Sequence, residues 1–425
     1  MLKVLTTITC LLIVLYNYRN KRLLSSSSIW VFCYLLIMVI NPIYYSEIIY
    51  INEDFIDVVA LGGSIFFFIG CVLGNQVRIK TRTKQDSNYY IVPDFYISCI
   101  AFWITFLLSI ATLIYLLGSE GIRSILLGIY TSKQFSLYSD ESNSLYVFSV
   151  HLMVPCILAM WITAEKKNEK RFRVFALLIY IVETILFGFT RIFMISILAI
   201  ILIYEMRYLP QRKQVLYSFI GVAILTAILV LMNFIRSLGL GRIEDLNTYV
   251  NLDYIFESTD FSASYYWFDR LLTIDPPYIN PIVYLKPFFM VIPRSIWETK
   301  PVPLSLQILK IVDPALIASG YSTAGNSVLG EAYAVLGYFG FFIFPVIWGV
   351  ICGLLDRNYY KRLWNGADKN LKNIFYYVFA VFIVISGQRG DWCQYMGTVL
   401  WFYFLPLYLL SKFSLRRKRQ KVGSI

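Results

Sequence analysis

Long uninterrupted runs of apolar residues constrain this chain more than any other feature. They measure 15 to 22 residues, contain few charges and recur on both sides of a single long polar-aromatic segment. An α-helix needs about 20 apolar residues to cross a bilayer, so such runs indicate membrane-spanning helices. Only 15% of the residues are charged, against about 25% in soluble domains. The sequence excludes a disordered chain, a disulfide scaffold and a soluble enzyme, and it predicts an all-α, polytopic membrane protein.

We predict eleven spans. Their ranges are 2–17, 29–48, 56–76, 95–117, 144–163, 173–189, 191–206, 214–235, 337–355, 373–388 and 393–411. More basic residues follow the first span than precede it and no small-x-small cleavage site is evident, so we interpret it as an uncleaved anchor. The predicted organisation is eight helices in 1–235, a large external (periplasmic) loop in 236–336, three helices in 337–412 and a basic cytoplasmic tail in 413–425.

The basic residues alternate in density from loop to loop. Of the 38 Lys and Arg residues, 26 lie on every second loop, and most of the acids lie on the loops between. Cytoplasmic loops carry an excess of Lys and Arg, so this alternation sets the orientation. It predicts an external N-terminus and a cytoplasmic C-terminus. The net charge of +12 is therefore a topology signal, and we expect no nucleic-acid partner.

Motifs for metals, disulfides and nucleotides are missing. All seven cysteines fall within predicted spans, and none has a C-x-x-C or metal-ligand spacing. The chain contains no G-x-x-x-x-G-K phosphate loop and no ATPase-like soluble domain. We expect neither a metal nor a cofactor, and the driving force must come from the substrate or from a gradient.

The segment 236–336 is far longer than an ordinary loop and is rich in Tyr, Phe, Ile and Trp. Long ordered loops are usually functional. Two stretches, Tyr254 to Asp275 and Leu304 to Ile311, have the composition of short helices. The simpler interpretation is a cap that only covers the bundle.

Within this segment, two prolines bracket the stretch 293–301, which contains Arg294, Trp297 and Lys300. The planar fork of arginine suits phosphate oxygens, and lysine adds a point charge. The indole offers a flat apolar face to a sugar ring. These residue types suit a lipid-pyrophosphate-linked sugar, but they are equally typical of an anchor at the membrane interface.

A second stretch, 320–340, combines small residues with the carboxylate of Glu331. Small residues allow close approach of a ligand or a neighbouring helix. A carboxylate near hydrocarbon is costly and is a functional candidate by default. Glu331 could act as a general base or pair with an external arginine. Asn326 and Tyr333 are candidate substrate-binding residues in the same stretch.

The Pro-Arg-x-x-Trp-x-x-Lys-Pro stretch at 293–301, the Gly-Glu-x-Tyr sequence at 330–333 and the many-span layout resemble the Wzy-type O-antigen polymerases, a family of oligosaccharide repeat-unit polymerases. The resemblance implies a GT-C-like glycosyltransferase that joins undecaprenyl-pyrophosphate-linked repeat units on the external face of the membrane. The growing chain is transferred from its lipid carrier onto a new unit, and undecaprenyl pyrophosphate is released. The implied partners are this lipid-linked oligosaccharide and membrane lipid. A chain-length regulator protein is left open.

The resemblance also implies that external arginines are important. Arg191 lies in a tight external turn, where members that this chain resembles carry an arginine, and an isolated arginine there needs an anionic partner such as pyrophosphate or a carboxylate. Arg389 lies in the other short external turn, beside Asp391, which could simply pair with it. Arg270 in the long loop is a weaker candidate. The Arg-x10-Gly pattern of some members is absent at the external arginines.

His151 and Glu183 lie inside predicted spans. A lone buried histidine is more often a satisfied packing group than a catalyst, but the two together could form a proton relay. The expected mechanism has Glu331 or His151 as general base, with Arg191, Arg294 and Lys300 stabilising the departing pyrophosphate. The alternatives are a flippase or transporter for the same lipid-linked oligosaccharide and, third, an acyltransferase or ligase acting on the same glycan.

Overall fold

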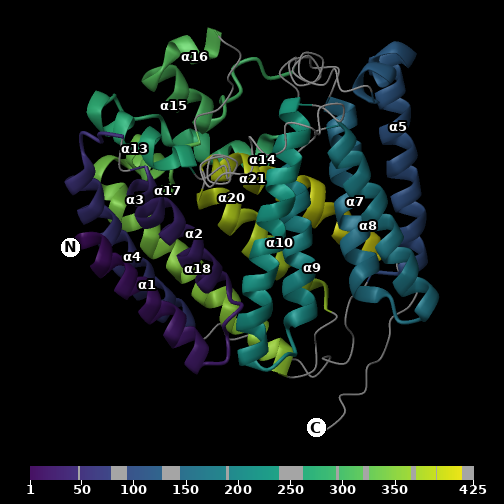
Figure 1. Ribbon diagram of the computed structural model, residues 1–425, viewed down its shortest axis with the longest axis horizontal. Helices are drawn as coiled ribbons and strands as arrows, with labels where there is room; N and C mark the ends of the chain where they lie inside the picture. The colour runs from purple at the N-terminus through teal and green to yellow at the C-terminus, as the bar shows by residue number, and fades with distance from the viewer. Residues whose placement is uncertain are drawn as a thin grey trace.

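The computed structural model describes residues 1–45, 48–77, 93–126, 144–187, 191–238, 262–292, 296–318, 325–364, 370–388 and 390–413. Of the predicted external loop, residues 239–261, 293–295 and 319–324 lie outside that description, and the tail lies outside it from residue 414. No strand occurs in the described ranges, which form a bundle of long helices with a layer of short helices at one end (Figure 1).

The helices of the N-terminal half are long. They are α1 (Leu2–Arg19), α2 (Ser26–Leu35) continued by η1 (Leu36–Ile40) and α3 (Asn41–Tyr44), α4 (Glu53–Gln76), α5 (Phe95–Leu126), α7 (Ser144–Thr163), α8 (Lys167–Phe187), α9 (Arg191–Met206) and α10 (Gln211–Leu238).

The second half begins with short helices and ends with long ones. The short helices are α13 (Ser262–Ile274), η4 (Pro281–Leu285), α14 (Lys286–Phe289), α15 (Leu304–Val312), α16 (Pro314–Ala318) and α17 (Val328–Leu336). The last group is η5 (Gly337–Phe339), α18 (Gly340–Trp364), α19 (Leu371–Val378), η6 (Phe379–Ile383), α20 (Val384–Gln388), α21 (Trp392–Thr398), η7 (Val399–Phe404) and α22 (Leu405–Lys412).

Seven helical segments within the described residues are long and apolar enough to cross a membrane. They are Leu2–Arg19, Ser26–Tyr44, Glu53–Gln76, Phe95–Tyr115, Gln211–Leu231, Val328–Trp364 and Trp392–Lys412. Each coincides with a predicted span, and the chain is therefore an α-helical multi-pass membrane protein. The other four predicted spans are also helical, but three contain only shorter apolar helices and α8 opens with a charged turn. The count of eleven stays a prediction.

The short helices predicted within the long loop are confirmed where they are described, as α13 and α15. The ninth span differs from its predicted range of 337–355. Its apolar segment runs over Val328–Trp364, because α17 joins α18 through a single 3₁₀ turn at Gly337, where φ is +62°. Residues that the sequence placed at the end of the loop therefore belong to the start of this span.

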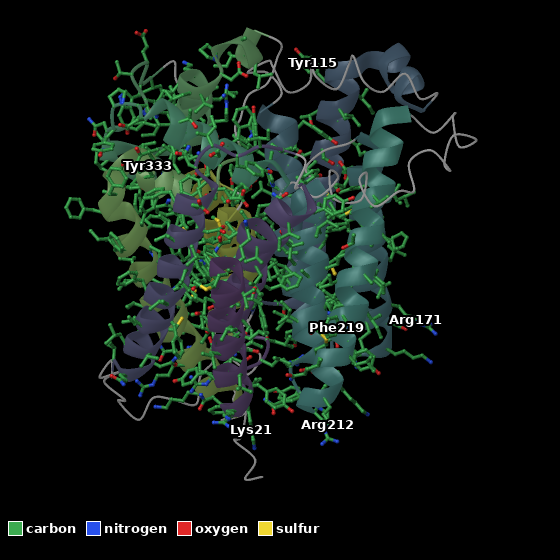
Figure 2. The ribbon with its side chains drawn as sticks, turned by 60° about the vertical axis from the view of Figure 1, so that its left-hand side comes forward. Lys21, Tyr115, Arg171, Arg212, Phe219 and Tyr333 are labelled. Carbon is green, nitrogen blue, oxygen red and sulfur yellow. The ribbon has the colours of Figure 1, made fainter. Side chains whose placement is uncertain are left out.

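The two ends of the bundle differ in charge. Figure 2 shows Lys21, Arg171 and Arg212 at one end and Tyr115 and Tyr333 at the other. We name the first the basic end and the second the upper end, as it lies in Figure 1. Residues from three separate basic segments that the sequence assigned to one side of the membrane thus gather at one end of the structure.

Helices α4 and α18 pack along a seam of small residues. Gly70 and Gly74 on α4 face Gly349 and Gly353 on α18. A Cβ atom at Gly70 would lie 2.3 Å from the carbonyl oxygen of Val346. A Cβ at Gly349 would lie 2.2 Å from the carbonyl oxygen of Phe67. Because backbone lies against backbone, this small-x-x-x-small seam allows an approach that no other residue type permits.

Polar contacts fasten both ends of this helix pair. At the basic end, Asp356 of α18 is 2% exposed. Its carboxylate accepts hydrogen bonds from Ser26 N (2.8 Å), Ser27 Oγ (2.6 Å) and Tyr376 Oη (2.7 Å). This carboxylate accepts from N–H groups in the first turn of α2, which have no partner within the helix. Negative charge is favoured at such a helix start.

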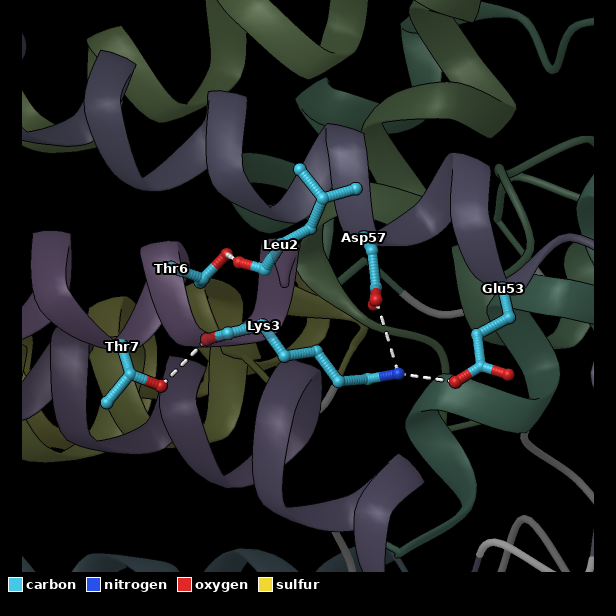
Figure 3. A network of polar contacts seen from close by, with 6 residues as sticks. All are labelled: Leu2, Lys3, Thr6, Thr7, Glu53 and Asp57. Carbon is cyan, nitrogen blue, oxygen red and sulfur yellow. Dashed lines mark hydrogen bonds and ion pairs between the residues drawn. The ribbon is translucent and has the colours of Figure 1, made fainter.

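At the upper end, Figure 3 shows Lys3 of α1 directed toward Glu53 and Asp57 of α4. The ammonium contacts Glu53 and lies 3.2 Å from Asp57 Oδ2. Asp269 of α13 accepts from Asn52 N at 2.7 Å, just before α4 begins. These contacts tie the short-helix layer and α1 to the same helix.

The seam predicts opposite effects for one substitution at two positions of α4. We expect Gly70→Ala to lower stability by about 1–3 kcal/mol, because the new methyl group meets backbone that cannot move away. Gly62→Ala is the matched control, since no atom lies within 4 Å of its Cβ position, and it should be neutral or stabilising by up to about 1 kcal/mol. Thermal unfolding in detergent measures both, and equal midpoints for the two variants would contradict the seam.

Candidate functional site

A group of buried polar side chains lies at the upper end, where the short helices meet the last spans. We name it the upper polar cluster. Its members are Tyr284, Lys286, Ser305, Asn326, Glu331, Gln388, Asp391, Trp392 and Gln394. They come from η4, α14, α15, α17, α20, α21 and the residues just before α17 and α21; Figure 1 shows α14, α20 and α21 close together in the upper half of the bundle.

Glu331 is at the centre of the cluster. It lies in the first turn of α17, which Ser327 caps by accepting from Gly330 N at 3.1 Å. Its side chain is fully buried. Its carboxylate accepts a hydrogen bond from Asp391 N and lies 3.5 Å from Trp392 N. The Glu331 side chain therefore holds the turn that leads into α21 by binding the backbone N–H groups of that turn.

That turn has an unusual backbone. Asp391 adopts a left-handed conformation with φ +56°, and it caps α21 by accepting from Gln394 N at 3.2 Å. Its other oxygen accepts from Ser305 Oγ at 2.6 Å. Gly390 has φ +112°, and a Cβ there would lie 2.3 Å from Asn326 O. The turn can thus lie against Asn326 only with glycine at this position.

Lys286 supplies the positive charge of the cluster. Its side chain is 5% exposed, and its ammonium donates to Gln394 Oε1 at 2.8 Å. The cluster thus combines one ammonium with the carboxyl groups of Glu331 and Asp391. Carboxylate oxygens are acceptors, so they suit hydroxyl or amide donors and offer no donor to a pyrophosphate oxygen.

Several buried polar atoms of the cluster have no hydrogen-bond partner within the described part of the chain. They are Asn326 Nδ2, Gln388 Nε2 and Oε1, Trp392 Nε1 and Tyr284 Oη. Burial, and next the charge of Glu331, raise the pKa of the Tyr284 hydroxyl, so it keeps its proton. Leaving a buried donor unpaired costs about 1–3 kcal/mol. So many unpaired groups in one place are typical of a site that a ligand or water completes.

The structure brings together Glu331, Asn326 and the turn beside Arg389. The sequence offered two roles for Glu331, a general base or the partner of an arginine; its described partners are backbone N–H groups. Arg389 itself lies outside the described residues, although Gln388 and Gly390 on either side of it lie at the cluster. Arg294 also lies outside them. Arg191 is the first residue of α9, and its side chain is not described.

The other candidates of the long loop make local contacts. Lys300 donates to the carbonyl oxygens of Met290 (2.7 Å) and Ile292 (2.8 Å). Trp297 donates to Thr299 Oγ1 at 3.0 Å. Both interpretations of this stretch, an interfacial anchor and a phosphate-binding site, stay predictions.

Two further candidates lie on α13 and α17. Tyr333 donates to Asp275 Oδ1 at 2.5 Å, which ties α17 to the end of α13. Arg270 is exposed on α13.

The candidates His151 and Glu183 lie deep in the bundle. His151 of α7 is 5% exposed, and its Nδ1 lies 3.2 Å from Tyr403 Oη of η7. Glu183 of α8 is 3% exposed and lies beside Ser109 of α5. Both belong to the half of the bundle formed by α5, α7, α8 and the last helices, away from the upper polar cluster.

Sequence reasoning missed six members of the cluster: Tyr284, Lys286, Ser305, Gln388, Trp392 and Gln394. The one signal in the sequence was Lys286, a cation within an otherwise uncharged aromatic stretch. The remaining five are ordinary residue types whose importance arises only from their neighbours.

No family model, no curated protein and no solved structure matches this chain. The fold and the site define it as an α-helical multi-pass membrane protein with a buried, carboxylate-containing polar cluster beneath a layer of short helices.

The turn at Asp391 predicts a contrast between two substitutions. Asp391→Ala removes the cap of α21 and the Ser305 bond, so we expect a loss of at least about 1–2 kcal/mol. Asp391→Asn keeps an acceptor for the cap and tolerates the left-handed backbone, so it should lose much less. Thermal unfolding of the purified variants checks this, and an Ala variant as stable as the Asn variant would be inconsistent with the capping role.

Proposed function

We propose that this protein is a polymerase of surface polysaccharide, such as O-antigen or capsule, in the bacterial cytoplasmic membrane. In this proposal it transfers an undecaprenyl-pyrophosphate-linked growing glycan onto a new lipid-linked repeat unit on the external face. The observation that carries the proposal is the upper polar cluster. It places two carboxylates and several unpaired donors at the end opposite the basic loops, beneath the helices of the long loop. The sequence resemblance at 293–340 supports it independently.

The proposed reaction forms one bond and breaks one bond. A hydroxyl oxygen of the new unit bonds to the anomeric carbon of the growing chain, whose bond to the pyrophosphate oxygen breaks. Undecaprenyl pyrophosphate leaves with the bonding electrons, and the hydroxyl proton passes to a carboxylate. Glu331 or Asp391 is the base in this scheme. Asp391 is 6% exposed and Glu331 is fully buried, so Asp391 is the more accessible of the two.

Cations stabilise the leaving pyrophosphate in this scheme. We assign this role to Arg191 and Arg294, because the ammonium of Lys300 is occupied by carbonyl oxygens. The carboxylates of the upper polar cluster offer no donor to pyrophosphate oxygens, which supports a position for the pyrophosphate outside the cluster.

A flippase for the same lipid-linked oligosaccharide is the second candidate. The buried pair His151 and Glu183 favours it, since ionisable groups inside spans mark transport pathways. A deletion strain separates the two. A single repeat unit on the external face without a ladder on a polysaccharide gel indicates a polymerase, and no external repeat unit indicates a flippase.

The assignment of Arg191 predicts loss of chain extension. We expect Arg191→Ala to reach the membrane in normal amounts and to leave only single repeat units on the gel. Arg171→Ala is the matched control, because Arg171 lies at the basic end (Figure 2) and should support a full ladder. Wild-type polymer lengths in the Arg191 variant would refute its role.

The proposed orientation predicts which introduced thiols react in intact cells. The native cysteines lie within helices, and six of the seven are buried. Ile296 is 77% exposed on the upper side, whereas Arg212 lies at the basic end (Figure 2). A membrane-impermeant maleimide should label Ile296→Cys in spheroplasts and label Arg212→Cys only after lysis. The reverse labelling pattern would show that the protein has the opposite orientation in the membrane.

A further inference from the structure

We propose that the unpaired donors of the upper polar cluster form a subsite for an uncharged sugar residue, the acceptor end of the new repeat unit. This inference rests on the proposed function and goes further, because it assigns the acceptor and the pyrophosphate to different places. The subsite residues are Tyr284, Asn326, Gln388 and Trp392, held around the turn that Glu331 anchors.

The four residues come from separate segments around one turn. The rings of Tyr284 and Trp392 lie 5.4 Å apart between centroids. The backbone of Asn326 lies against Gly390, within the turn that joins Gln388 to Trp392, and its side-chain amide lies over Gly330 at the start of α17. Asn326 and Gln388 are 0% and 1% exposed. Two buried amides, an indole and a phenol, each with an unpaired donor, thus lie around the same turn.

The chemistry of these groups selects the ligand. Each of the four offers a donor, and Gln388 Oε1 adds an acceptor. Sugar hydroxyls both accept and donate hydrogen bonds, so they can satisfy the unpaired donors and the unpaired acceptor. The nearby carboxylates of Glu331 and Asp391 can accept hydrogen bonds from further hydroxyls. Trp392 packs among Tyr284, Phe344 and Trp348, an aromatic group suited to the apolar face of a pyranose. A phosphate oxygen is an acceptor and finds no donor in these carboxylates.

The short-helix layer lies against the turn and α21. Two side-chain bonds join them, one from Ser305 to Asp391 and one from Lys286 to Gln394. Tyr284 lies on η4 of this layer and Trp392 begins α21, so the subsite lies where the two meet.

Gln388→Leu tests the subsite. Replacing an unpaired buried amide by an apolar group of similar shape should leave ligand-free stability unchanged or increased. The same change should weaken binding of the repeat-unit oligosaccharide, freed from its carrier by mild acid, by about tenfold, since it removes at least one hydrogen bond. Calorimetry on the full chain in nanodiscs measures this affinity, with inorganic pyrophosphate as the second probe, whose binding should not change.

Gln307→Leu is the matched control. Gln307 lies on α15 of the same layer and donates to Val302 O, so its loss should leave both affinities as in the wild type. Tyr284→Phe removes a single hydroxyl and is the second test variant if Gln388→Leu fails to fold. It should weaken oligosaccharide binding severalfold.

The outcomes separate the inference from the proposed function. No oligosaccharide binding by the wild type, unchanged affinity in both variants, or a loss confined to pyrophosphate would each overturn the subsite. Weakened oligosaccharide binding supports it. If the deletion strain still makes a full ladder while Gln388→Leu binds sugar weakly, the sugar subsite stands and the polymerase proposal fails.

Discussion

The rest of the structure depends on the backbone contact between α4 and α18. A bilayer supplies no hydrophobic force between apolar helices, so their association needs close packing. Gly70 and Gly349 provide it by bringing main chain against main chain. This contact joins an early helix to a late one. The polar bonds of Asp356 tie α18 to α2 at the basic end, and those of Asp269 tie the start of α4 to α13 at the upper end.

The seam also sets the position of the upper polar cluster. Because α17 joins α18 through one tight turn at Gly337, fixing α18 fixes Glu331 as well. A buried carboxylate is costly unless it is hydrogen-bonded, and Glu331 obtains its partners from the backbone of the turn at Asp391. The turn itself is possible only because Gly390 tolerates a positive φ and contact with Asn326. One packing constraint thus leads, step by step, to the geometry of the candidate site.

The sequence anticipated the parts of this protein that follow from local composition. Apolar runs identified the seven long spans, and the helices α13 and α15 were found from short amphipathic stretches. Glu331 was recognised because a carboxylate in an apolar stretch is unusual. Gln388 was not, since a glutamine next to a span carries no local signal. Its interest arises from being buried without a partner, and burial is a property of the packed chain.

By itself, then, the sequence determined that this is a helical membrane protein and which of its loops share a side, because hydrophobic length and charge are properties of single segments. Only the tertiary structure decided which polar groups meet. Lys286, Ser305, Glu331 and Asp391 lie up to about a hundred residues apart in the sequence, and no local rule relates them. They come together because the spans pack at fixed positions along the membrane normal. Lipid offers few hydrogen-bond partners, so buried polar groups must find theirs within the protein.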